Sequence, residues 1–250
     1  MISIISPAKT MDSSFQIQNV KSKNFEQSIL YKNLIKQLYL LDINDIKAIM
    51  KVSDKIAELN YQRYQKFEDL PSKQAIYAYD GDVYRNIDRQ NLSKDDLIFA
   101  QIHLRIISGL YGLLKPLDQI KAYRLEMITK LAKFAPSGLS KYWQDHITNK
   151  LNIDIEKCSS KYLINIASNE YVAAVDPLKL NFPIINIFFL EEKAGVFKNI
   201  AINAKKARGM FANYIITNKI DIPKELFDFN IANYKYNSKL SDDNNYYFVR

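Results

Sequence analysis

Segments typical of β-strands stand at both ends of this 250-residue chain, with helical segments between them. A short apolar run occupies residues 2–6, and runs rich in β-branched and aromatic residues occupy 161–168, 183–192 and 196–204. No Pro-, Ser- or Gly-rich linker and no internal repeat divides the chain. The sequence therefore predicts one mixed α/β (α+β) domain over residues 1–250, with a central mixed sheet and surrounding helices.

The middle of the chain predicts most of the helices. Apolar residues recur at helical spacing over residues 25–41, and Asp42 and Ser53 can cap two further helices that reach about Met50 and Phe67. The Ser93 hydroxyl can accept from the amide three residues on, which starts a helix that we expect to reach Ser108. We also expect a strand at 74–79, a turn at 79–82, and helices ending at Leu151 and spanning 205–219.

The charge balance favours a polyanionic partner. The chain carries 35 Lys and Arg against 27 Asp and Glu, a formal net charge of +8. DNA or a phosphorylated small molecule is the expected partner. The single cysteine, Cys158, excludes an internal disulfide and suits a reducing cytoplasm. With no secretory signal and no run approaching ~20 apolar residues, we expect a cytoplasmic protein without a membrane partner.

Several kinds of chemistry lack the residues they need. The two histidines and one cysteine are too few for a usual zinc site, and no glycine spacing matches a P-loop, a dinucleotide fingerprint or a nucleophile elbow. We expect no metal and no cofactor. His103 shares a helical face with Phe99 and Ile106, which favours a core residue over a general base. Cys158 has only lysines nearby to lower its pKa, so a peroxide-sensing thiol is a minor alternative.

Three clusters combine basic and polar residues where the chain changes direction. The first, residues 6–12, follows the leading strand and offers Lys9 for an anion, with the hydroxyls of Ser6 and Thr10 and the carboxylate of Asp12 beside it. Residues at the end of a buried strand are a common place for ligand contacts because the scaffold holds them rigidly. The alternative is a loop with a solvated lysine and a helix cap.

The second cluster, residues 103–127, contains Gly109 and Gly112 between Arg105 and Arg124. A helix to Ser108, a glycine turn and an apolar continuation resemble a helix-hairpin-helix, whose amides can point at one phosphate. The alternative is that the glycines serve only the turn. Its last residues bring Tyr123, Arg124 and Glu126 together, either as a surface ion pair or as a group that orients a substrate.

The third cluster, residues 204–209, lies where a strand gives way to a helix. Lys205 and Arg208 share one helical face, while Lys206 points elsewhere. Cations at the start of a helix oppose the helix dipole, and their placement makes sense if an anion sits there. Residues 165–171 put further polar groups at another strand end, namely Asn165, Ser168, Asn169 and Glu170.

These motifs, ISPAKTMD, GDVY, HLRIISGLYGLLKPLD, YRLEM, NIASNEY and AKKARG, resemble those of the bacterial peroxide stress resistance YaaA family, in order over nearly the whole chain. Ala122 and Ile128 depart from the Pro and Gly expected beside YRLEM, and Asn169 stands where Asp is common. The resemblance implies a cytoplasmic protein that limits oxidative damage and lowers free iron. It also implies a compact α/β fold with a basic cleft, a helix-hairpin-helix and DNA binding.

The leading hypothesis is therefore a DNA-binding protein that contacts the phosphate backbone. The expected contacts are Lys9, Thr10, Arg105, Gly109, Gly112, Arg124, Lys205, Lys206 and Arg208. The alternative is an enzyme acting on a nucleotide, a nucleobase or damaged DNA in the same pocket, with Glu126, Asp12 and Tyr123 as the candidate catalytic residues. Direct iron binding by carboxylates is a third possibility, for which no acidic cluster is evident.

Overall fold

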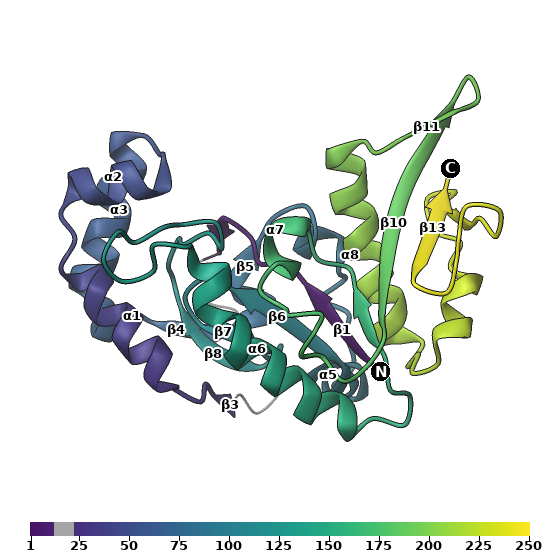
Figure 1. Cartoon of the computed structure of the whole chain (residues 1–250), viewed down its shortest axis with the longest axis horizontal. Coiled ribbons are helices and arrows are strands. Elements are labelled where there is room, and N and C mark those ends of the chain that lie inside the picture. The colour runs from purple at the N-terminus through teal and green to yellow at the C-terminus, as the bar shows by residue number, and fades with distance from the viewer. Residues whose placement is uncertain (13–22) are drawn as a thin grey trace.

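The computed structural model describes residues 1–12 and 23–250. Within these residues, eight strands form one mixed sheet, in the order β12-β13-β10-β9-β1-β6-β7, with β11 paired to β10 (Figure 1). The bounds are β1 Ile2–Ile5, β6 Leu104–Ser108, β7 Gly112–Leu114, β9 Leu163–Asn165, β10 Ile184–Lys193, β11 Val196–Lys198, β12 Lys235–Tyr236 and β13 Asn245–Val249.

The first strand of the chain lies in the middle of this sheet. β1 pairs in parallel with β6 on one side and with β9 on the other, and β10 and β13 continue the parallel set beyond β9. β7, β11 and β12 pair antiparallel to their neighbours. All four residues of β1 are buried, as a strand covered on both faces requires. The predicted mixed α/β fold with a central mixed sheet is confirmed.

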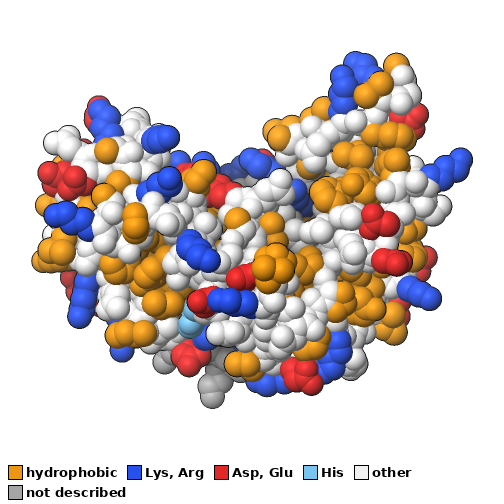
Figure 2. All heavy atoms as spheres, in the orientation of Figure 1, with side chains coloured by type: hydrophobic (Ala, Val, Ile, Leu, Met, Phe, Trp, Pro, Cys, Tyr) orange, Lys and Arg blue, Asp and Glu red, His pale blue; other side chains and the backbone are white. Residues whose placement is uncertain are grey.

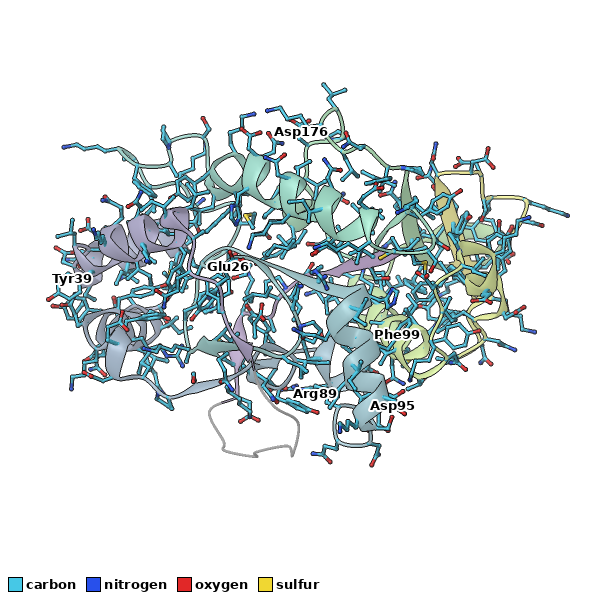
Figure 3. All side chains as sticks on the ribbon, turned by 90° about the horizontal axis from the view of Figure 1, so that it is seen from below. Glu26, Tyr39, Arg89, Asp95, Phe99 and Asp176 are labelled. Atoms are coloured by element: carbon cyan, nitrogen blue, oxygen red, sulfur yellow. The ribbon has the colours of Figure 1, made fainter. Side chains whose placement is uncertain are left out.

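Helices cover both faces of the sheet. Three of them are α5 Lys94–His103, α6 Leu139–Glu156 and α8 Ala201–Thr217. α5 and α8 contact each other and β1, whereas α6 packs on β1 and β7. In Figure 3, α5, which carries Phe99, and α6 lie on opposite sides of the strands. Phe189 of β10 and Phe248 of β13 meet Phe211 of α8 at ring-centroid distances of 5.6 and 5.1 Å, which anchors α8 to the sheet.

The helical segments predicted before residue 70 form a lobe at one end of the sheet (Figure 1). Asp42 caps α2 in a reciprocal capping box with Asp45, and Ser93 does the same for α5 with Asp96. The lobe and its connections comprise α1 Ile29–Tyr39, α2 Ile43–Met50, α3 Asp54–Gln65 and η1 Phe67–Asp69.

Short elements complete the connections between the lobe, the sheet and the C-terminal strands. They are β2 Thr10–Met11, β3 Lys23–Asn24, β4 Ser72–Gln74, α4 Ala75–Ala78, β5 Tyr79–Asp80, η2 Tyr84–Asn86, β8 Asp118–Lys121, α7 Asn169–Val172 and η3 Pro223–Asp228. β2 pairs with β5, and β3, β8 and β4 form a separate small sheet.

The glycine turn differs from its prediction. The helix from Ser93 ends at His103, residues 104–108 form β6, and β6 turns at residues 109–111 into the antiparallel β7. The predicted helix-hairpin-helix is therefore wrong, and the element is a β-hairpin. Pairing of β6 with the buried β1 outweighs the helical spacing of this apolar segment.

Two further boundaries are corrected. Residues 74–79 do not form one strand, because β4 ends at Gln74 and one turn of helix, α4, precedes β5. Strand β11 ends at Lys198, and residues 201–204 belong to α8, although their apolar, β-branched character favoured a strand. The exposed residues of this first turn, Ala201 and Ile202, are apolar, so their composition does not distinguish a helix from a strand.

Candidate functional site

Several of the predicted basic and polar residues meet in a pocket at the carboxyl ends of β1 and β9. After β1 the chain adds β6 and β7 on one side of it and later β9, β10 and β13 on the other, so the strand order reverses at β1. Such a topological switch point is where open α/β sheets usually bind ligands. The cavity, here called the strand-end pocket, measures about 340 Å³. Its lining comprises Ser6, Pro7, Ala8, Lys9, Thr10, Asp80, Gly81, Asp82, Val83, Tyr84, Ser168, Glu170, Tyr171, Lys205 and Arg208.

The surface is hollowed on the side to which these strand ends point. In Figure 2, the hollow lies between the lobe that holds α2 and α3 and the arm that β10 and β11 form, and Lys and Arg side chains are visible at its bottom. Some acidic side chains stand among them. The hollow therefore combines a wide concave face with charge of both signs.

Hydrogen bonds tie the two strand ends together. The Ser168 amide donates to Ser6 Oγ over 2.9 Å, and Ser6 Oγ lies 3.3 Å from Ser168 Oγ. The Tyr84 hydroxyl donates to the Ser6 carbonyl oxygen over 3.0 Å. Burial raises the pKa of Tyr84, so this phenol stays a neutral donor at physiological pH. The floor of the pocket is thus fixed before any ligand arrives.

Two glycines bring the basic helix onto this floor. A Cβ on Gly209 would lie 2.1 Å from the Val83 carbonyl oxygen, so only glycine allows α8 to approach the turn at residues 81–84. On the other side of that turn, a Cβ on Gly81 would lie 3.1 Å from the Ala8 Cβ. These close contacts place Lys205 and Arg208 beside the segment that follows β1.

Arg208 is the residue with the least satisfied side chain in the pocket. Its Nε is buried without a hydrogen-bond partner, and no ion pair forms with it among residues 1–12 and 23–250. Burial lowers the pKa of the guanidinium. Arg208 as a whole is half-buried, and withdrawing part of a cation from water without a partner is unfavourable unless a negative group accompanies it. Lys205 is exposed at the rim of the pocket, while Lys206 is exposed but outside it.

The segment after β8 adds a second charged group beside the pocket. Glu126 accepts from Lys9 Nζ at 2.9 Å and from Arg124 Nη2 at 3.1 Å. Arg124 Nε is also buried without a partner. Glu170, which lines the pocket, accepts from the Ile128 amide at 3.3 Å. The predicted contacts Lys9, Thr10, Lys205 and Arg208 thus converge, and Arg124 joins them through Glu126.

Other predicted contacts lie elsewhere. Arg105 is buried and binds Asp154 of α6 over 2.7 Å, in a different cavity. Gly109 and Gly112 are buried as well, and the Gly109 carbonyl accepts from Trp143 Nε1 over 2.9 Å. Their amides therefore do not face a ligand, and the turn is built for packing.

None of the three candidate catalytic residues lines the pocket, although Glu126 lies beside it and binds Lys9. The Tyr123 hydroxyl is buried between Tyr79 and Ser108, at 2.7 and 2.6 Å, and burial raises its pKa to about 12. Asp12 accepts from Lys73 Nζ at 3.1 Å. Sequence reasoning overlooked Asp82 and Tyr84 as lining residues, although a glycine beside two carboxylates at residues 80–82 was a usable signal.

The residues that the structure describes contain neither a membrane-spanning helix nor a cluster of metal ligands. No helix in residues 1–12 and 23–250 has the length and apolar character needed to cross a membrane. In the same part of the chain, no three His, Cys, Asp or Glu side chains gather as a set that could hold a metal ion.

Comparisons with known proteins agree with the motifs. A family model described as peroxide stress protein YaaA matches residues 1–240. Similar proteins include a UPF0246 protein of Rickettsia bellii, 46% identical over 254 residues, and one of Rickettsia rickettsii, 41% identical over 250 residues. A UPF0246 protein of Crocosphaera subtropica is 39% identical over 252 residues. Each match covers 100% of both chains. The chain therefore belongs to the peroxide stress protein YaaA family.

Proposed function

We propose that this member of a peroxide stress family binds DNA on the hollow face, with a phosphate group held in the strand-end pocket by Arg208 and Lys205. Bound in this way, the protein would limit iron-dependent oxidative damage to the DNA. The glycine hairpin has no part in the contact, because it is buried behind α6.

One observation carries the proposal, namely the half-buried side chain of Arg208, whose Nε is buried without a hydrogen-bond partner. A phosphate supplies the negative charge and several acceptor oxygens that such a group lacks, and Arg binds phosphate with a matching planar geometry. Lys205 and Lys9 line the same pocket. The net charge of +8 adds a long-range attraction for a polyanion.

A salt series tests the DNA contact. We expect a labelled short duplex, followed by fluorescence anisotropy, to bind more weakly as salt rises from about 50 to 200 mM, because neutralised phosphates release counterions. Arg208→Ala should weaken binding about ten-fold or more, since a hydrogen-bonded charge is removed. Lys206→Ala is the matched control, because this neighbour on α8 lies outside the pocket.

The wild type and the two variants together test whether the protein binds DNA and whether it does so through the strand-end pocket. A duplex that does not bind even at low salt contradicts the DNA proposal. If Arg208→Ala and Lys206→Ala weaken DNA binding equally, DNA is attracted by the general positive charge of the surface, and the strand-end pocket does not hold a phosphate.

The second candidate is an enzyme that acts on a nucleotide, a nucleobase or damaged DNA. The carboxylates favour it, because Asp82 and Glu170 line the pocket and Glu126 binds Lys9, whereas a site for the DNA backbone alone does not need acids. Glu126→Gln keeps the shape and removes the charge. If the activity is enzymatic, this variant should bind DNA normally but fail to protect cells against peroxide. Unchanged protection together with unchanged binding argues against catalysis by Glu126.

A further inference from the structure

A second cavity, of about 440 Å³, lies between the C-terminal half of α6, the start of β6 and the turn that follows β7. Its charged lining includes Arg105, Lys115, Lys150, Asp154 and Lys157. It shares no lining residue with the strand-end pocket. Of the helices that cover the sheet, α6 and Gln101 of α5 line this cavity, whereas α8 supplies Lys205 and Arg208 to the strand-end pocket. We call this cavity the α6 pocket.

One stripe of α6 supplies much of the wall. Lys150, Asp154 and Lys157 follow one another at helical spacings of four and three residues, so their side chains share one face of α6. Lys150 binds Glu26 over 2.9 Å, and Asp154 binds Arg105 over 2.7 Å. Glu26 comes from the segment that precedes α1 (Figure 3). Each of these two ion pairs joins one cation to one carboxylate, so the four side chains together add no net charge to the wall.

Positive charge remains after these pairings. Lys115 and Lys157 form no ion pair with any residue in 1–12 or 23–250, although both line the cavity. Burial and then the charge of Arg105 lower the pKa of Lys115, as expected for an ammonium group crowded by other cations. The remaining carboxyl group is Asp118, whose pKa burial raises and whose carboxylate accepts from the Lys115 amide.

A buried amide adds a donor that has no acceptor. Gln101 is only 8% exposed, and its Oε1 accepts from the Leu117 amide over 2.8 Å. That bond fixes the orientation of the side chain, because only the oxygen can accept from an N–H. Its Nε2 is therefore a donor, and it is buried without a partner at the wall of the cavity. Buried donors without acceptors are rare and require an explanation.

We propose that the α6 pocket is a second anion site, which binds a small phosphorylated molecule through Gln101 Nε2 and the ammonium groups of Lys115 and Lys157. A phosphate group offers several acceptor oxygens to donors that come from different elements, and the volume is that of a metabolite-sized site. The proposal is independent of the DNA contact, because the strand-end pocket takes no part in it.

Calorimetric titration of the full chain with pyrophosphate tests the site. Gln101→Glu keeps the oxygen that accepts from Leu117 and replaces the free donor with a carboxylate oxygen, so it should weaken pyrophosphate binding at least ten-fold. Lys115→Met should have a similar effect with the packing retained. Arg208→Ala, which alters only the strand-end pocket, should keep the binding event that these two variants remove. Thermal unfolding of each variant shows that the fold is intact.

The outcomes separate the two sites. Absence of pyrophosphate binding to the wild type overturns the second site. So does loss of all binding in Arg208→Ala with no effect of Gln101→Glu or Lys115→Met, since the anion then occupies the strand-end pocket alone. Succinate that binds as tightly as pyrophosphate, and with the same sensitivity to Lys115→Met, overturns the phosphate assignment. Loss of DNA binding in Arg208→Ala bears only on the proposed function.

Discussion

At the residue scale, Gly112 combines two requirements that only glycine meets. Its φ is +75°, and a Cβ would lie 2.7 Å from the Trp143 ring. We expect Gly112→Ala to lower the free energy of unfolding by about 2–4 kcal/mol, from overpacking and from the left-handed backbone. Gly195→Ala is the control, because its φ is +77° with no atom within 4 Å of the added Cβ. Urea unfolding that finds equal losses contradicts a packing role for Gly112.

At the scale of elements, the ion pair between Arg105 of β6 and Asp154 of α6 joins the sheet to the helix that covers it. Arg105 is 2% exposed and also donates to two backbone carbonyls. Asp154→Ala should cost about 3–5 kcal/mol of stability, because it leaves a buried cation without its partner. Asp145, on the same helix, pairs with Lys179 at the surface, so Asp145→Ala should change little. Thermal unfolding measures both. A small effect of Asp154→Ala shows that water or Asp118 replaces the carboxylate.

The same scale separates what the sequence could predict from what it could not. Helix starts were predictable where a local cap exists, as at Asp42 and Ser93, because the bonds involved lie within four residues. The 104–114 hairpin was not, because its strand conformation comes from pairing with β1 about a hundred residues earlier. Likewise, the position of Lys205 and Arg208 on one face of a helix was predictable from the spacing of these two residues alone. The role of Gly209 depends on Val83, which no local pattern reveals.

At the scale of the whole molecule, the two histidines make stability depend on pH. Burial is the main cause that lowers the pKa of both His103 and His146. The unfolded chain, with histidine pKa values of about 6.5, therefore binds more protons than the folded protein as pH falls, and stability falls with it. We expect lower urea midpoints at about pH 5.5 than at pH 7.5.

His103→Gln should reduce the loss of stability between pH 7.5 and pH 5.5. The variant keeps His146, which acts in the same direction, and Asp118, whose raised pKa acts in the opposite direction. His103 stacks on Phe99 at 4.2 Å and its Nδ1 lies 2.9 Å from the Met1 carbonyl oxygen, which confirms it as a residue of the protein interior. An unchanged loss of stability in His103→Gln contradicts the assignment.

The central position of β1 also governs how the protein can be made. β1 is synthesised before its neighbours β6 and β9, which begin at residues 104 and 163, and β10 acquires β13 only at residues 245–249. Until β6 has been made, the nascent chain carries an apolar strand without a partner, and until β13 has been made β10 lacks its neighbour on that side. Closing such distant contacts is slow and leaves sticky surface exposed. The parallel set can therefore be completed only late in synthesis, when β13 has been made, and until then the nascent chain exposes apolar surface.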